Sequence, residues 1–185
     1  MPHISVIIPV YNAGNYIVDT LNSVLRQTLK DIEVIVVNDG SNDQSLVECY
    51  RLQEIDKRII IINQDNQGVS KARNVGKQNA TGDYIIFIDA DDELDCRMLE
   101  ILYTQARKTD SDISVCGVDR IFEKKQEEKK KYQHYFDQSS VGSGTEASTS
   151  ATACCCAATS PAEPLSWIRC ASTGTATALM SSGTT

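Results

Sequence analysis

The sequence lacks the features that mark several classes of protein. No apolar run approaches the roughly 20 residues that a helix needs to cross a bilayer. There is no leader of the secretory kind, in which basic, apolar and small residues follow one another. Basic residues are outnumbered, with 18 Lys and Arg against 25 Asp and Glu and a net charge of −7. Because binding to nucleic acid phosphates needs a basic face, we expect no nucleic-acid partner.

Metal-binding cysteine pairs are also missing. The seven cysteines include no CxxC spacing, so a zinc site is not expected. An odd number of cysteines without a secretory leader favours a reducing, cytoplasmic location.

Charged residues become scarce after Ser139, where Ala, Ser, Thr, Gly and Cys dominate; those that remain are Glu146, Glu163 and Arg169. Low-complexity sequence of this kind cannot bury much core and is usually disordered. A genuine extension, a frameshifted or appended end, and a stretch of misassigned residues would all fit, and the abrupt change favours the last two. We therefore predict an α/β domain over residues 1–122, a charged connecting segment over 123–138 and a tail of undefined identity over 139–185.

Before that change, apolar strands alternate with amphipathic helices. Continuous β-branched runs predict buried strands at Ile4–Pro9, Ile32–Val37, Arg58–Asn63, Tyr84–Ile88 and Ile113–Val118. Apolar residues between these runs recur at helical spacing, as in Ile17, Leu21, Val24 and Leu25. Strict alternation implies right-handed crossovers between parallel strands. The predicted fold is α/β, a doubly wound and mostly parallel sheet with helices on both faces.

Local signals predict how three of the helices begin or pack. Asn15 is placed to cap the first helix, and the pair Ser41 and Gln44 fits a capping box for the second. The third helix has one face of small or short side chains, which should let it pack close to the sheet: Val69, Ala72, Gly76 and Ala80.

Polar and acidic residues follow three of the predicted strands, in the segments Val10–Asn12, Asn38–Ser41 and Asp89–Asp92. The carboxyl ends of parallel strands meet at one edge of the sheet, where ligands bind in this class of fold. Any one of these loops is accounted for by ordinary turn chemistry. Three of them at one edge favour a binding site.

The segment after the fourth strand places Asp89, Asp91 and Asp92 within four residues. Crowded carboxylates repel one another, and a divalent cation would offset that repulsion. Hard oxygen ligands suit Mg²⁺ or Mn²⁺, which proteins usually share with substrate phosphates. Alternatively, Asp92 and Asp95 cap the following helix. Capping would account for one of the acids and not for all three.

Four segments resemble, in order and spacing, the motifs of the family 2 glycosyltransferases of the GT-A fold. They are Ile4–Asn12, Val37–Ser41, Gly68–Gly76 and Phe87–Asp92, and together they span roughly the first 120 residues. The resemblance implies metal-assisted transfer, with inversion, of a sugar from a nucleotide-diphosphate sugar, most often UDP-linked, to a glycan or lipid-linked acceptor. It implies a cytoplasmic protein, with peripheral association at the inner membrane face as one arrangement for glycan assembly.

The resemblance also implies roles at matching positions. The residues that should border the nucleotide base are Pro9, Val10 and Tyr11. Asp39 should accept a hydrogen bond from the base, and Arg73 should lie near the nucleotide, although a salt bridge is the alternative role for that side chain. The nucleotide-sugar site should include Asp89, Ala90 and Asp91; Asp91 should coordinate Mn²⁺ or Mg²⁺, and Asp89 should lie near the ribose and the metal. Asn38 departs from the family pattern, in which many relatives have Asp.

The catalytic base that the resemblance implies is not identifiable. Relatives supply a carboxylate from an acidic pair downstream, and no Glu-Asp or Asp-Asp pair follows Asp92. A module that binds nucleotide sugar without turnover is therefore the alternative. A phosphoacceptor receiver domain fits less well, because no acid follows the first strand. A dinucleotide-binding oxidoreductase would need a GxGxxG segment there, which is absent.

Overall fold

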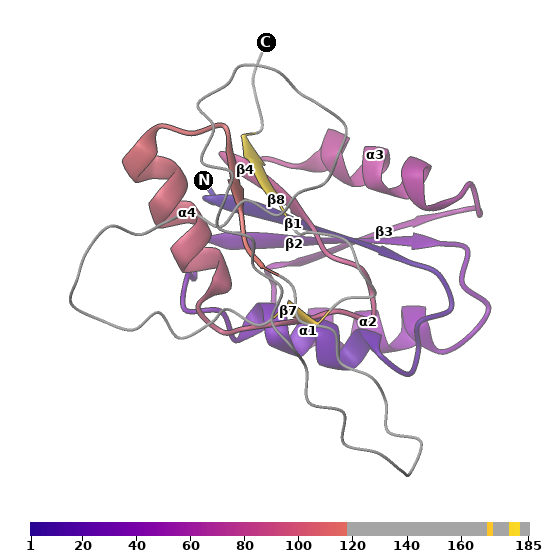
Figure 1. Cartoon of the computed structure of the whole chain (residues 1–185). Coiled ribbons are helices and arrows are strands. Elements are labelled where there is room, and N and C mark those ends of the chain that lie inside the picture. The colour runs from indigo at the N-terminus through magenta and orange to yellow at the C-terminus, as the bar shows by residue number, and fades with distance from the viewer. Residues whose placement is uncertain (118–169, 172–177, 182–185) are drawn as a thin grey trace, which may run out of the picture.

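The computed structural model describes residues 1–117, 170–171 and 178–181. The elements alternate much as the sequence predicts (Figure 1). Their order is β1 (Ile4–Val10), α1 (Ile17–Leu25), β2 (Ile32–Asp39), α2 (Ser45–Ile55), β3 (Ile59–Gln64), α3 (Val69–Asn79), β4 (Tyr84–Phe87), β5 (Glu93–Leu94), α4 (Met98–Thr109), β6 (Ile113–Val115), β7 (Cys170–Ala171) and β8 (Ala178–Ser181).

The main sheet has six strands in the order β3-β2-β1-β4-β8-β6. β1 pairs in parallel with β2 and with β4, and β2 pairs in parallel with β3. β8 is antiparallel to both of its neighbours, so β6 runs in the same direction as β4. This arrangement confirms the predicted mostly parallel α/β sheet. The short strands β5 and β7 form a separate antiparallel pair.

Helices cover both faces of the sheet. Figure 1 shows α3 on one side and α1 and α2 on the other. The side chains agree, because Ala72 of α3 packs in one core cluster with Ile7 and Ile35, whereas the other three helices contribute to a second, larger cluster. Residues of α1, α2 and α4 in that cluster include Leu21, Leu52 and Leu102.

The small residues of α3 allow the close approach that the sequence predicts. Gly76 is buried, and a Cβ atom added to it would lie 2.3 Å from the Cγ2 atom of Ile7 on β1. Such a contact is far inside van der Waals distance, so with a larger residue either Ile7 or the helix would have to shift. Glycine at position 76 thus sets the spacing between α3 and the sheet.

One residue of the predicted tail lies in the core. Leu179 of β8 is fully buried between β4 and β6, whereas Met180 and Ser181 are exposed, so low burial in this stretch as a whole stays a prediction. β6 ends at Val115, three residues before the predicted end of that strand. The predicted divisions after residues 122 and 138, together with Glu146 and Glu163, lie outside the described residues.

The predicted caps of α1 and α2 are wrong. In the described part of the chain no side chain caps α1, whose N-cap residue is Tyr16 and not Asn15. At the start of α2, Asp43 accepts a hydrogen bond from the Ser45 N–H at 2.9 Å. Ser41 instead accepts from the Asn12 N–H at 3.1 Å, and so joins two loops.

Among residues 1–117, 170–171 and 178–181, no helix has the length and apolar character that a membrane span requires.

Candidate functional site

The loops after β1 and β2 are tied together by side chains. Pro9 and Val10 are buried at the end of β1, whereas the Tyr11 side chain is 52% exposed. In each bond a backbone N–H of one loop donates to a side-chain oxygen of the other: the bonds run from Asn12 N–H to Ser41 Oγ, from Asn42 N–H to Asn12 Oδ1, from Ala13 N–H to Ser45 Oγ and from Gly14 N–H to Asp43 Oδ2. Tyr11 is therefore an accessible aromatic ring on a braced loop.

Asp39 ends β2 and organises the loop that follows β3. Its Oδ1 atom accepts from Gln64 Nε2 at 2.7 Å and from the Gln67 N–H at 2.9 Å. Its Oδ2 atom accepts from the Gly68 N–H at 2.8 Å. A carboxylate offers about four acceptor positions, so about one remains for an outside donor.

The surroundings of Asp39 favour its charged form. Burial alone would raise the pKa of this carboxyl, but the hydrogen bonds from Gln67, Gln64 and Gly68 outweigh burial and hold the pKa below its ordinary value. Only 3% of the residue is exposed, so these hydrogen bonds hold a buried carboxylate.

Arg73 of α3 reaches across to the residue after β4. Its Nη2 atom lies 2.7 Å from Oδ1 of Asp89, so the structure contains the salt bridge that the sequence leaves as an alternative role for Arg73. The Nε atom of Arg73 is buried and has no hydrogen-bond partner among the described residues. One donor of the guanidinium thus holds Asp89, and another lacks a partner.

The turn after β4, Asp89–Asp92, crowds three carboxyl groups. Asp89 is half-buried, Ala90 and Asp92 are buried, and Asp91 is exposed. Burial, together with the negative charges of Asp89 and Asp91, raises the pKa of Asp92 to about 7. Its Oδ1 atom has no hydrogen-bond partner within the described ranges.

Within the described residues, neither Asp92 nor Asp95 caps α4, whose N-cap residue is Arg97 and which has no side-chain cap hydrogen bond. Asp95 accepts from the Arg97 N–H at 2.9 Å in the turn that leads into α4. Asp92 lies earlier, and its own N–H donates to the Asp89 carbonyl at 3.1 Å.

The donor set of this turn fits a hard divalent cation. Carboxylate oxygens, such as those of Asp89 and Asp91, are ligands that Mg²⁺ and Mn²⁺ prefer, and a cation would offset the repulsion that adds to the effect of burial on the pKa of Asp92. Among the described residues, no group of three or more His, Cys, Asp or Glu side chains is arranged so that it could hold a metal ion. The turn therefore fits a cation that substrate oxygens help to bind, and it does not fit a structural metal site.

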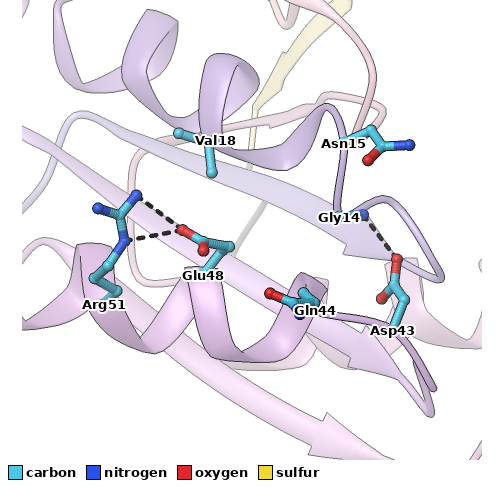
Figure 2. A pocket seen from close by; sticks show the side chains of 7 residues that line it. All are labelled: Gly14, Asn15, Val18, Asp43, Gln44, Glu48 and Arg51. Atoms are coloured by element: carbon cyan, nitrogen blue, oxygen red, sulfur yellow. Dashed lines mark hydrogen bonds and ion pairs between the residues drawn. The ribbon is translucent and has the colours of Figure 1, made fainter.

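A groove of about 510 Å³ lies beside the braced loops, between α1 and α2 (Figure 2). Figure 2 shows Arg51 paired with Glu48, and Asp43 bonded to the Gly14 N–H. The residues that line it are Gly14, Asn15, Val18, Asp43, Gln44, Glu48 and Arg51. None of the predicted nucleotide-sugar residues is among them, so the groove is separate from the predicted site.

Several contributors are not among the predicted residues. Gln64, Gln67 and Gly68 bind Asp39, and a loop rich in Gln, Asn and Gly after the third strand is the signal that could have indicated them. Thr20 of α1 donates to the Ala90 carbonyl, and its signal is a polar residue beside the apolar stripe of that helix.

The sheet order, the helices on both faces and the acidic turn at the carboxyl edge define a GT-A fold of the Rossmann-like kind. The sequence profile described as "Glycosyl transferase family 2" matches residues 5–162. The chain belongs to glycosyl transferase family 2, which confirms the resemblance seen in the motifs.

Curated relatives share much of the described region. Glycosyltransferase GlyA of Streptococcus pneumoniae serotype 4 is 46% identical over 112 residues, which is 60% of this chain and 16% of GlyA. GlyG of the same organism is 39% identical over 113 residues, 60% of this chain and 38% of GlyG. EpsJ of Bacillus subtilis, an uncharacterized glycosyltransferase, is 44% identical over 119 residues, 63% of this chain and 34% of EpsJ. The chain thus spans well under half the length of these relatives.

Solved structures of Staphylococcus aureus TarS share the fold. TarS 1-349 superposes with a TM-score of 0.62 and 28% sequence identity, covering 69% of this chain and 39% of that one. The same protein in complex with UDP-GlcNAc gives a TM-score of 0.61 at 28% identity, covering 69% of this chain and 37% of that one.

Proposed function

We propose that this chain forms the donor-binding half of an inverting glycosyltransferase, which transfers a sugar from a UDP-linked donor to a glycan or lipid-linked acceptor in the cytoplasm. The proposal includes Mn²⁺ or Mg²⁺ bound by Asp91 and Asp89. Family membership supports the reaction class, and the TarS complex with UDP-GlcNAc supports a uridine nucleotide.

One observation carries the proposal. At the carboxyl edge of the sheet, a braced loop with an exposed aromatic ring, a buried carboxylate with a spare acceptor position and a crowded acidic turn follow β1, β2 and β4, which are neighbouring strands. A nucleoside diphosphate needs a stacking surface, an acceptor for its base and charge compensation for its phosphates. Each need has a matching feature at this edge.

Each of the site residues has a separate role in the proposed binding of the donor. Pro9, Val10 and Tyr11 border the base, and Asp39 accepts from it through its free acceptor position. Arg73 holds Asp89 in one orientation and places a guanidinium beside the acidic turn. When bound, a divalent cation would neutralise negative charge on the departing nucleoside diphosphate.

In the reaction, the acceptor hydroxyl forms a bond to the anomeric carbon as the bond from that carbon to the diphosphate breaks. The hydroxyl proton passes to a base, which we do not assign to any described residue. The alternative, a binding module without turnover, gains no support from the family match, which continues to residue 162.

Calorimetric titration of UDP with and without Mn²⁺ tests the proposal. The wild-type chain should bind UDP more tightly with the metal, and Asp91→Ala should lose the metal-dependent part. The matched control is Asp112→Ala, which removes another exposed carboxylate just before β6, at the opposite edge of the sheet. It should bind like the wild type. A folded wild-type chain that binds neither UDP nor another nucleoside diphosphate would overturn the proposal.

A further inference from the structure

A row of buried polar side chains runs along the inner side of α1 and ends two residues after the helix. Thr20, Ser23 and Gln27 recur at helical spacing and are 1%, 7% and 0% exposed. Polar groups at such positions cost free energy unless they are hydrogen-bonded, and an apolar residue would avoid that cost. Their partners therefore indicate what the row does.

All three side chains bond to the backbone between residues 90 and 99. Thr20 Oγ1 donates to the Ala90 carbonyl at 2.8 Å, and Ser23 Oγ accepts from the Leu94 N–H at 3.1 Å. Gln27 donates to the Asp95 carbonyl at 2.6 Å and accepts from the Leu99 N–H at 2.9 Å. Apart from the two-residue strand β5 and the first turn of α4, this segment is not in a helix or strand, and Thr20, Ser23 and Gln27 supply hydrogen-bond partners to its backbone.

The hydrogen bond of Thr20 reaches the acidic turn itself. The Ala90 carbonyl belongs to the peptide that joins Ala90 to Asp91, in the middle of the acidic turn. Carboxylates in this turn repel one another, so the turn needs a tether to hold one conformation. The Tyr16 carbonyl lies farther from the Thr20 hydroxyl, at 3.3 Å, so the single hydroxyl hydrogen is shared at most weakly with it and the bond to Ala90 is the shorter one.

We propose that Thr20 is a positioning residue for donor binding, which fixes the acidic turn so that the Asp89 and Asp91 carboxylates are preorganised for a metal–diphosphate complex. This inference rests on the proposed function and adds a residue from outside the four sequence motifs. Thr20 itself contacts no ligand in this proposal. Its effect passes through the Ala90 carbonyl.

Three variants of the full chain test the inference. Thr20→Val keeps the shape of the side chain and removes the hydroxyl, and Thr20→Ser restores it. The matched control is Ser5→Ala, since Ser5 is a fully buried hydroxyl that bonds Glu33 at 2.6 Å and the Gly82 N–H at 2.8 Å, towards the opposite end of the sheet. Thermal denaturation measures the structural cost of each change.

Two readouts separate positioning from general stability. Hydrogen exchange of peptides spanning residues 88–95 should be about tenfold faster in Thr20→Val, with exchange in β1 unchanged. UDP binding with Mn²⁺ should weaken about tenfold, while UDP binding without metal stays within about twofold of wild type. Thr20→Ser should recover both, and Ser5→Ala should lower the melting temperature without moving either.

The inference would be overturned if Thr20→Val lowered the thermal stability but left hydrogen exchange of residues 88–95 and UDP affinity with Mn²⁺ at their wild-type values. It would also be overturned if Ser5→Ala weakened metal-dependent binding to the same degree as Thr20→Val. A wild-type chain that fails to bind UDP with Mn²⁺ would count against the proposed function, and the exchange comparison would still decide whether Thr20 tethers the turn.

Discussion

The Nη2 atom of Arg73 lies 2.7 Å from the Oδ1 atom of Asp89. This pair joins α3, which covers one face of the sheet, to the acidic turn after β4. The two side chains are 36% and 29% exposed, so solvent screens their attraction. The pair is therefore expected to contribute more to the orientation of Asp89 than to the stability of the fold.

Arg73→Gln should lower the free energy of unfolding by no more than about 1 kcal/mol, because partly exposed ion pairs contribute little. It should weaken Mn²⁺-dependent UDP binding by about tenfold, because Asp89 loses its ion-pair partner and the site loses the positive charge of the guanidinium. Urea denaturation and calorimetry measure the two effects. Arg51→Gln is the control, which breaks an exposed ion pair with Glu48 on α2. The same loss of binding in both variants would contradict a specific role for Arg73.

Asp39→Asn should lower the free energy of unfolding by about 2 kcal/mol at neutral pH, because hydrogen bonds to a buried charge are lost. The folded pKa of Asp39 lies below the unfolded value of about 3.9, so its stabilisation is present above that value and is lost as the pH falls through the folded pKa. The stability difference between wild type and variant should be constant above about pH 5 and shrink below about pH 4. Denaturation curves at a series of pH values would refute this if the difference stayed constant.

Gly76→Ala should destabilise the fold by about 1 to 3 kcal/mol, because the new methyl group would overlap Ile7 and push α3 from the sheet. Lys77→Ala, at the exposed neighbouring position, should change stability by less than about 0.5 kcal/mol. Thermal denaturation compares the two. A well-tolerated alanine at position 76 would mean that α3 lies further from β1 than the structure shows.

Leu179→Ala should cost about 2 to 4 kcal/mol of unfolding free energy, as expected for a large side chain removed from a core. Met180→Ala, one position along β8 and 41% exposed, should cost less than about 1 kcal/mol. Chemical denaturation measures the free energy of unfolding of both variants. If Leu179→Ala costs as little as Met180→Ala, β8 does not belong to the core.

The sheet could be predicted because its strands are continuous apolar runs. Four isoleucines in a row at residues 59–62 are hard to place anywhere but in a strand, and β3 begins at Ile59. The close packing of α3 could be predicted for a similar reason, since Ala72 and Gly76 share one helical face. These signals are local, and the physical preferences behind them act within a few residues.

Contacts distant in sequence could not be predicted in the same way. The loop that binds Asp39 lies 25 to 29 residues further along the chain, and Thr20 bonds a carbonyl 70 residues away. β8 is only four residues long and lies in a tail of small residues, so its apolar pair Leu179 and Met180 gives too short a pattern to indicate a strand. The predicted caps failed because Asp43, one residue before Gln44, supplies the bond at the start of α2.

The most direct test of donor binding at the acidic turn is paramagnetic broadening of amide resonances by Mn²⁺ with UDP, compared with Mg²⁺ and UDP in the same isotope-labelled chain. We predict the strongest selective broadening at Asp89–Asp92, and weaker broadening in the loops after β1 and β2. Strongest broadening in the groove between α1 and α2, at residues such as Gly14 and Glu48, would contradict the proposed site.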